Sequence, residues 1–304
     1  KISIVTPSYN QGQFIEETIR SVLLQGYPNI EYIIIDGGSK DSTVEVIKKY
    51  EPFIAYWVSE KDNGQANALN KGFARATGEI FYWINSDDFP AKNTFGVVAN
   101  FFARHPEYDV AYGDCFYIDG NYELLKVSKP RPFSKGDLII GNIFDQPTTF
   151  FKAEVWGKFG QTREDLRFIM DYELWLRWAL KDIRFAYCPQ ITVYFRLHGD
   201  SKSTNLQRVN QNENFALLVQ LGNSGQVSAD LVPKIKMGLK QLCLQSYWLR
   251  DSRQFWSLLV KYIKYTKAFP DFSLLLRGLL VLSGKGTMER MSQLKYKFQK
   301  AKAR

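Results

Sequence analysis

The stretch Phe81-Tyr82-Trp83-Ile84-Asn85-Ser86-Asp87-Asp88 joins an apolar run with the character of a β-strand to two adjacent carboxylates. An uninterrupted apolar strand is typical of a parallel sheet covered on both faces, and ligands bind such sheets outside the carboxyl ends of the strands. Two neighbouring carboxylates repel each other, and Mg²⁺ commonly binds proteins through one or two carboxylates together with substrate phosphates. The stretch alone leaves two interpretations open: a metal site, or a solvated loop that leads into the next helix.

Strand and helix patterns alternate through the first 90 residues. This alternation predicts βαβ units, and therefore an α/β fold with a parallel sheet covered by helices on both faces. After it we expect a helix, a strand and a hairpin. The expected strands are 2–6, 31–35, 54–58 and the run that ends at Asp87; the expected helices are 14–24, 42–50, 65–76 and 93–104; the later strand is 110–114 and the hairpin 116–127.

Polar segments follow all four of the early strands. They are TPSYN at 6–10, DGGSKD at 36–41, SEKDNG at 59–64 and NSDD at 85–88. Turn chemistry explains any one of them, but the ends of parallel strands meet at one sheet edge, which predicts a binding site. Neither GxxxxGK[ST] nor GxGxxG is present, so phosphates must be bound in another way. A metal on Asp87 and Asp88 would do this and leave Asp36 and Asp62 for a nucleobase or ribose.

The positive charge of the chain is concentrated in its last quarter. The net charge is +9, but residues 231–304 hold 16 Lys and Arg against 3 Asp and Glu, a net of +13, whereas residues 1–230 carry 24 against 28, a net of −4. This asymmetry predicts an anionic partner for 231–304, either a membrane surface or nucleic acid. We expect no nucleic acid, because no RNA-binding or DNA-binding module is present.

The spacing of the cysteines and the length of the apolar runs indicate the cellular compartment in which the protein works. Cys115, Cys188 and Cys243 match no metal-binding or disulfide spacing, which favours a reducing, cytoplasmic setting. No signal peptide is recognisable at the start. The longest apolar run, 272–283, is interrupted by Arg277 and is shorter than the roughly 20 residues that cross a bilayer. We therefore expect a cytoplasmic protein that could attach peripherally to the inner face of the cytoplasmic membrane.

Four blocks of this sequence resemble the family 2 glycosyltransferases, which have the GT-A fold. TPSYNQGQFIEETIRSVLLQ at 6–25, EYIIIDGGSKDST at 31–43, SEKDNGQANALNKGFARATGE at 59–79 and INSDD at 84–88 match the pattern of that family in order and spacing. The resemblance covers about two-thirds of the chain. It implies a GT-A domain at 1–206, with a nucleotide-binding half at about 1–90 and an acceptor half at about 91–206, followed by a basic α-helical region at 207–304.

The resemblance also implies roles for the residues that match the motifs of the family. They are Pro7, Tyr9 and Asn10 in the first nucleotide-contacting loop, Asp36 and Asp62 at the nucleobase and ribose, Asn70 and Lys71 beside the donor pocket, Ser86 and Asp87 at the ribose and sugar, Asp88 as the first metal ligand, and His198 as a further metal ligand. The pattern Ser-Asp-Asp departs from a strict Asp-x-Asp motif, so the metal affinity or the choice of metal could differ.

Asp171 begins the amphipathic helical pattern MDYELWLRW at 170–178. The residues alone favour a helix N-cap over a catalytic base. The resemblance reverses this preference, because the family keeps its acceptor-activating Asp at the matching position. One departure is that Met170 stands where the commonest form of the motif has Glu.

The resemblance implies an inverting glycosyltransferase that uses Mg²⁺ or Mn²⁺ and moves a sugar from a nucleoside-diphosphate sugar to a hydroxyl of a saccharide or lipid-linked acceptor. The expected process is synthesis of cell-surface polysaccharide or glycolipid. A catalytically silent nucleotide-sugar-binding module tethered by its basic tail is an alternative. A sugar-phosphate nucleotidyltransferase is less favoured, since 7–14 lacks the Gly-rich, Arg-containing loop that this activity needs.

Overall fold

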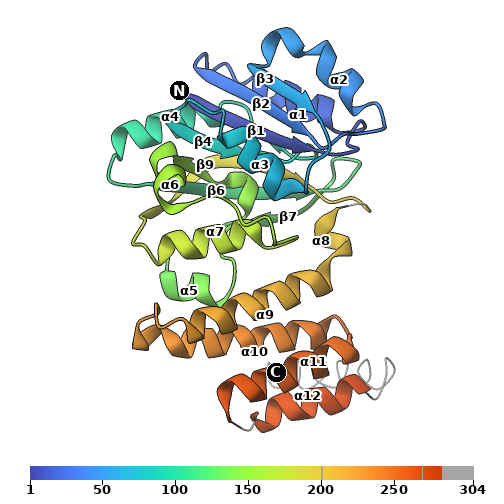
Figure 1. Cartoon of the computed structure of the whole chain (residues 1–304), viewed down its shortest axis with the longest axis vertical. Helices are drawn as coiled ribbons and strands as arrows, with labels where there is room; N and C mark the ends of the chain where they lie inside the picture. Colours follow the sequence, from blue (N-terminus) through green and yellow to red (C-terminus); the bar gives the residue numbers. More distant parts are fainter. Residues whose placement is uncertain (200, 269, 283–304) are drawn as a thin grey trace, which may run out of the picture. The chain divides into compact units, whose positions relative to one another are not determined.

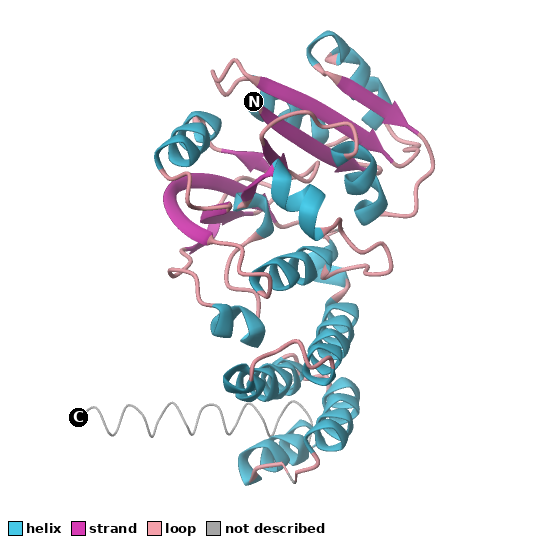
Figure 2. Cartoon of the chain, turned by 60° about the vertical axis from the view of Figure 1, so that its left-hand side comes forward, coloured by secondary structure: helices cyan, strands magenta, loops and turns pink. Residues whose placement is uncertain are grey.

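The computed structural model describes residues 1–199, 201–268 and 270–282. The chain forms two compact units, Lys1–Asn210 and a second unit that begins at Gln211. All the strands described belong to the first unit, and the described part of the second unit is helical (Figure 2). The predicted domain limits, 1–206 and 207–304, remain a prediction about function.

The first half of the first unit has the predicted alternation. Strands β1 (Ile2–Ser8), β2 (Ile30–Asp36), β3 (Tyr56–Ser59) and β4 (Ile80–Trp83) alternate with helices α1 (Ile15–Leu23), α2 (Thr43–Lys49) and α3 (Gln65–Phe73), and the short helix η1 (Glu51–Phe53) precedes β3. The four strands are parallel, in the order β3-β2-β1-β4. Their carboxyl ends therefore meet at one edge of the sheet, as the sequence predicts.

The second half extends the same sheet with mixed strand directions (Figure 1). Strand β8 lies antiparallel between β4 and β6, β6 and β9 are parallel, β5 pairs with β9, and β7 pairs with β6. The elements are β5 (Phe89–Pro90), α4 (Thr94–Arg104), β6 (Val110–Ile118), β7 (Leu124–Ser128), α5 (Lys135–Ile140), η2 (Gln146–Thr148), β8 (Phe150–Lys152), α6 (Ala153–Phe159), α7 (Met170–Ala179), β9 (Phe185–Arg196) and α8 (Lys202–Asn205).

Strand β4 is apolar at every position because helices cover both of its faces. Its four residues are all buried. Tyr82 meets Phe95 of α4 at a ring distance of 5.9 Å on one face, and Trp83 stacks on Trp175 of α7 at 5.3 Å on the other. Alternate residues of a strand point to opposite faces, so both faces demand apolar side chains here. The polar segment that follows β4 is thereby held at the end of a rigid strand.

The described part of the second unit consists of helices, as the sequence predicts for that region. They are α9 (Gln207–Asn223), which also spans the boundary of the first unit, η3 (Ala229–Leu231), α10 (Val232–Trp248), α11 (Ser252–Thr266) and α12 (Phe272–Leu282). Asp251 caps α11 by accepting a hydrogen bond from the Gln254 N–H at 3.0 Å. Within the described residues, every helix is too short or too polar to cross a lipid bilayer.

Glu31 ties the amino-terminal ends of the central strands to the loop before β4. Its carboxylate accepts hydrogen bonds from the Ser3 hydroxyl at 2.5 Å and the Thr77 N–H at 2.7 Å. Burial raises the pKa of Glu31, but the hydrogen bonds from Ser3, Thr77 and Lys1 outweigh it and lower the pKa to about 2. The charged carboxylate is thus more stable in the folded protein than in the unfolded chain.

We expect Glu31→Gln to lower the free energy of unfolding at pH 7 by about 1.5–3 kcal/mol, because it removes hydrogen bonds to a charged group. The contribution of Glu31 is present above its ordinary pKa of 4.5 and fades as the pH falls toward about 2. Urea unfolding at pH 7 and pH 4 should therefore show a smaller difference at pH 4. Glu45→Gln on the exposed side of α2 is the control; equal effects of both substitutions would contradict the prediction.

Candidate active site

A cavity of about 560 Å³ opens at the carboxyl ends of the parallel strands. It collects residues from the loops after β1, β2, β3 and β4, from the start of α3 and from the segment after β9. Six predicted site residues line it: Pro7, Tyr9, Asp62, Ser86, Asp87 and Asp88. Other lining residues were not predicted as site residues, among them Gln11, Lys61, Gln65, Asn85, Ser201 and Lys202.

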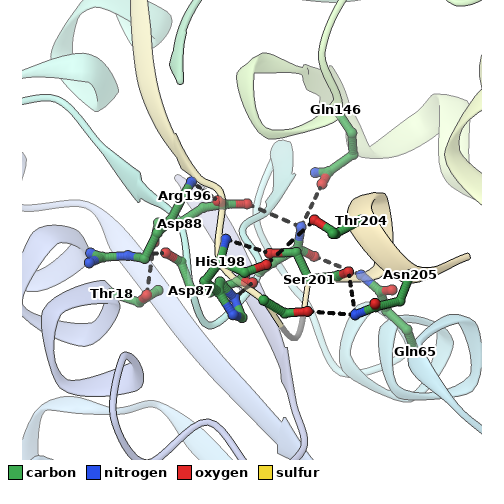
Figure 3. Close-up of polar contacts among 12 residues, drawn as sticks. Thr18, Gln65, Asp87, Asp88, Gln146, Arg196, His198, Ser201, Thr204 and Asn205 are labelled. Carbon is green, nitrogen blue, oxygen red and sulfur yellow. Dashed lines mark hydrogen bonds and ion pairs between the residues drawn. The ribbon is translucent and has the colours of Figure 1, made fainter. Parts of the chain in front are cut away.

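Asp87 and Asp88 lie in different surroundings (Figure 3). Asp87 is half-buried, and its Oδ2 lies 3.1 Å from Nε2 of His198. Asp88 is 1% exposed, and its carboxylate accepts hydrogen bonds from the Arg196 N–H at 2.9 Å and the Asn85 side-chain amide at 3.2 Å. The sequence predicts the metal on Asp88 first, and this remains a prediction. Asp87 and Asp88 both line the cavity, and the side chains of Asp87 and His198 are 21% and 10% exposed.

The electrostatics of the two carboxylates call for a positive charge. Burial, followed by the charge of Asp87, raises the pKa of Asp88 well above its ordinary value, and hydrogen bonds from Arg196 and Asn85 oppose this rise. Among the described residues, no group of three or more His, Cys, Asp or Glu side chains is arranged to hold a metal. A cation bound here would therefore need further ligands from a substrate.

His198 is held by the turn that follows β9. Its N–H donates to the Ser201 hydroxyl at 3.1 Å, and its carbonyl accepts the Ser201 N–H at 3.1 Å. Its ring lies 4.5 Å from the ring of Phe14. The imidazole is thus held beside Asp87 by backbone hydrogen bonds and by packing on Phe14.

Lys202 lines the cavity, although the sequence did not predict it as a site residue. Its amino group donates to Oε1 of Gln65 at 2.6 Å, and the Gln65 amide donates to Asn85 at 2.7 Å. Loss of hydration around the amino group lowers the pKa of Lys202, and the carboxylates of Asp87, Asp171 and Asp62 are among the charges that oppose this. Lys202 thus places a cation at the cavity wall. The feature of the sequence that points to Lys202 is its position four residues after His198, which is a predicted metal ligand.

Asp171 lies in the first turn of α7, where the N-cap residue is Ile169. The N-cap interpretation of Asp171 is therefore wrong. The half-buried carboxylate accepts hydrogen bonds from the N–H groups of Tyr172 and Asp171 itself, yet burial outweighs them, and the charge of Asp145 adds to burial, so the pKa of Asp171 rises to about 6. A carboxyl group with this pKa is mostly ionised at neutral pH and is a stronger base than an ordinary Asp.

Asp36 accepts hydrogen bonds within its own loop and is not among the residues that line the cavity. It is fully buried, and it accepts hydrogen bonds from the N–H groups of Gly38 at 3.1 Å and Ser39 at 2.9 Å and from the Ser59 hydroxyl at 2.6 Å. Contact with a nucleobase or ribose would require this loop to open. Asn10 joins the same loop, because its N–H donates to the Ser39 hydroxyl at 2.7 Å.

Asn70 and Lys71 point away from the cavity, although Gln65 of the same helix lines it. The Asn70 amide donates to the Thr162 carbonyl at 3.0 Å, which connects α3 to the loop before α7. Lys71 pairs with Glu60 at 2.6 Å and lines a separate cavity. In this structure Asn70 and Lys71 therefore support the site from outside.

Comparison with known sequences identifies the family to which this chain belongs. A sequence model of the family described as Glycosyl transferase family 2 matches residues 3–155. TuaG of Bacillus subtilis, described as a putative teichuronic acid biosynthesis glycosyltransferase, is 40% identical over 216 residues, covering 67% of this chain and 82% of that protein. The chain therefore belongs to glycosyl transferase family 2, and it is a glycosyltransferase.

A further relative is also described as a glycosyltransferase, and two solved structures have a similar fold. An uncharacterized glycosyltransferase of Mycobacterium tuberculosis, Rv1514c, is 32% identical over 195 residues, covering 63% of this chain and 71% of that protein. S. aureus TarS in complex with UDP-GlcNAc matches with a TM-score of 0.66 at 16% identity, over 87% of this chain and 81% of that one. The mannosyltransferase PcManGT from Pyrobaculum calidifontis, in complex with GDP-Man and Mn²⁺, matches with a TM-score of 0.63 at 19% identity, over 97% and 84%. The fold is thus GT-A.

Proposed function

We propose that this protein is an inverting glycosyltransferase that transfers a sugar from a nucleoside-diphosphate sugar to an acceptor hydroxyl in polysaccharide or glycolipid synthesis. The observation that carries the proposal is the position of Lys202, which lines the cavity and lies within electrostatic reach of Asp87, Asp62 and Asp171. One cation thus connects the expected diphosphate end of the site with the expected base. The nucleotide sugars in the TarS and PcManGT complexes support a donor of this class.

The cavity has the size and polarity that a nucleotide sugar requires. Its volume of about 560 Å³ lies within the usual range for small-molecule sites. Lys61 and Lys202 supply positive charge for a diphosphate, and Asp62 offers a carboxylate to hydroxyl groups. Tyr9 is 58% exposed at the cavity wall, so its ring is free to stack on a base.

Asp87 and His198 fit a divalent cation such as Mg²⁺ or Mn²⁺. They offer one carboxylate oxygen and one imidazole nitrogen 3.1 Å apart, and a diphosphate would complete the oxygen ligands that these ions prefer. Asp88 also lines the cavity, with its carboxylate already hydrogen-bonded to the Arg196 N–H and the Asn85 amide. A bound cation would neutralise negative charge on the leaving diphosphate. The Mn²⁺ in the PcManGT complex supports this assignment.

Asp171 is the proposed general base. Its carboxylate takes the proton of the acceptor hydroxyl while the hydroxyl oxygen forms a bond to the anomeric carbon of the donor sugar. The bond between that carbon and the diphosphate oxygen breaks in the same displacement, which inverts the configuration at the carbon. A pKa of about 6 leaves Asp171 ionised at neutral pH and ready to accept the proton.

We expect a nucleoside-diphosphate sugar to raise the thermal unfolding midpoint, and Mn²⁺ to increase that shift. A panel of UDP, GDP, dTDP and CDP sugars, with and without Mn²⁺, measures both effects. Asp87→Asn should remove most of the Mn²⁺-dependent shift, because it replaces the accessible carboxylate. Asp165→Asn, in an exposed pair with Arg163, is the control. A wild-type protein that responds to no sugar nucleotide in the panel would contradict the proposed donor class.

We expect Asp171→Asn to reduce sugar transfer by about 10²- to 10⁴-fold, the usual contribution of a general base, while leaving donor binding intact. In the wild type, kcat/KM should fall as the pH drops through about 6, because the base becomes protonated. Since the raised pKa of Asp171 disfavours the folded state above pH 6, the Asn variant should unfold at an equal or higher temperature.

The measurements are turnover of the donor identified in the panel and thermal unfolding at pH 8. Asp182→Asn, with its exposed side chain just beyond α7, is the matched control. Near-normal turnover by Asp171→Asn would overturn the assignment of the base.

We also propose that the C-terminal region attaches the protein to the inner face of the cytoplasmic membrane, near a lipid-linked acceptor. The described residues 231–282 contain 9 Lys and Arg against 2 Asp and Glu. Helix α11 exposes Arg253, Lys261 and Lys264 at intervals that place them on one face. The rest of the basic tail, 283–304, lies outside the described residues. Anionic phospholipid is the partner that this charge fits.

We expect the protein to co-sediment with vesicles of phosphatidylserine and phosphatidylcholine at low salt, and less with phosphatidylcholine alone. Lys261→Gln with Lys264→Gln should lower binding by roughly 30-fold, since each basic residue contributes about 1 kcal/mol near an anionic surface. The control is Lys48→Gln with Lys49→Gln, a pair of exposed lysines in the first unit. Binding that is insensitive to salt and lipid charge would exclude this mode of attachment.

A further inference from the structure

Arg196, the last residue of β9, is a buried cation that the proposed reaction does not use. It is 3% exposed. Its guanidinium lies over the rings of Tyr122 at 4.9 Å, Phe14 at 5.0 Å and Phe89 at 5.5 Å. Aromatic faces attract a cation, but they do not replace the hydrogen bonds that it loses on burial. The contacts of Arg196 with acidic residues and with the backbone must do so.

Arg196 makes these contacts on both sides of the carboxylate pair. Its N–H donates to Oδ1 of Asp88 at 2.9 Å, and its Nε donates to the carbonyl oxygen of Asp87 at 3.1 Å. A terminal nitrogen of the guanidinium pairs with Glu17 of α1, and the Tyr122 hydroxyl also donates to Glu17 at 3.0 Å. The side chain of Arg196 thus connects α1 with the turn that follows β4, and its backbone N–H adds a hydrogen bond to Asp88.

The turn that carries Asp87 and Asp88 is also restrained by side-chain hydrogen bonds of Asn85 with Asp88, Gln65 and Gln146. The Asp88 N–H donates to the Asn85 carbonyl at 3.2 Å, and the Thr18 hydroxyl donates to the Asp88 carbonyl at 2.8 Å. The Asp87 carbonyl accepts from the Arg196 Nε. Because the peptide plane of Asp87 sets the direction of its side chain, this hydrogen bond bears on whether the carboxylate faces His198.

We propose that Arg196, held by Glu17, is a positioning residue that fixes the Asp87–Asp88 turn and so aims the Asp87 carboxylate at His198. The ordering of the turn by Arg196 is inferred from the hydrogen bonds described above. Its effect on metal binding rests on the proposed function. A planar guanidinium donates to Glu17 and to the Asp87 carbonyl at the same time, which the single ammonium of Lys does less well. Residues that orient a metal ligand are worth about 10- to 100-fold in metal affinity.

The test compares Arg196→Gln, Arg196→Lys and Glu17→Gln with Arg184→Gln. Arg184 is the matched control, because it pairs with Asp109 at 3.4 Å just before the start of the same strand. Hydrogen–deuterium exchange of the peptide that covers 84–89 reports the turn directly and needs no metal. Binding of Mn²⁺, with and without UDP or GDP, is measured by electron paramagnetic resonance, and circular dichroism checks folding.

We expect Arg196→Gln and Glu17→Gln to speed exchange in 84–89 by at least about tenfold and to weaken Mn²⁺ binding by about 10- to 100-fold. Arg196→Lys should recover part of both effects, and Arg184→Gln should change neither. If Arg196→Gln does not fold, Glu17→Gln decides, since Glu17 is partly exposed and its loss leaves the backbone contacts of Arg196 in place.

Exchange in 84–89 that is the same in the folded Glu17 and Arg196 variants as in Arg184→Gln would overturn the positioning role. A wild-type protein that binds no Mn²⁺ while exchange in 84–89 still depends on Arg196 would instead refute the metal site and leave the positioning role standing. The two failures are therefore distinguishable.

Discussion

The repulsion between two adjacent carboxylates at the end of a buried strand is the constraint on which the site depends. Strand β4 cannot move to relieve it, because α4 packs on one face and α7 on the other. Asp88 is accommodated by burial against hydrogen-bond donors, and Asp87 is left to face His198 and the cavity. Two neighbouring residues of the same type therefore differ in exposure and in hydrogen bonding: Asp88 is enclosed by donors, and Asp87 is more open.

A third carboxylate, that of Asp171, is also held in place by packing against β4. Asp171 begins a helix whose Trp175 packs on the β4 residue Trp83, so the base and the carboxylate pair are held by a common aromatic contact. Asp145 is among the groups that raise the pKa of Asp171, and the Tyr117 hydroxyl donates to Asp145. The pKa of the proposed base is thus adjusted by Asp145, in the loop before β8, which itself accepts a hydrogen bond from Tyr117 of β6.

The sequence predicted the parallel half of the sheet well, because each of its strands is a continuous apolar run that ends in a polar turn. It located Pro7, Tyr9, Asp62, Ser86, Asp87 and Asp88 at the cavity for the same reason. It could not tell that Asp36 is fully enclosed by its own loop, since burial of a turn carboxylate depends on tertiary contacts such as the Ser59 hydroxyl. It predicts the metal on Asp88 first, and that assignment remains a prediction. It could not show that the Arg196 N–H donates a hydrogen bond to Asp88, because Arg196 lies more than a hundred residues away in the chain.

The long separation between Asp88 and Arg196 has a consequence for biosynthesis. The two residues are 108 positions apart, so the carboxylate pair leaves the ribosome well before the strand whose backbone N–H donates to Asp88. Domains fold as units during synthesis, and an incomplete sheet exposes unpaired strand edges. The segment matched by the family ends at residue 155, before β9, and therefore contains the acids without their partners. Water hydrates both carboxylates in the unfolded nascent chain, so the enclosed position of Asp88 can form only after β9 has been made.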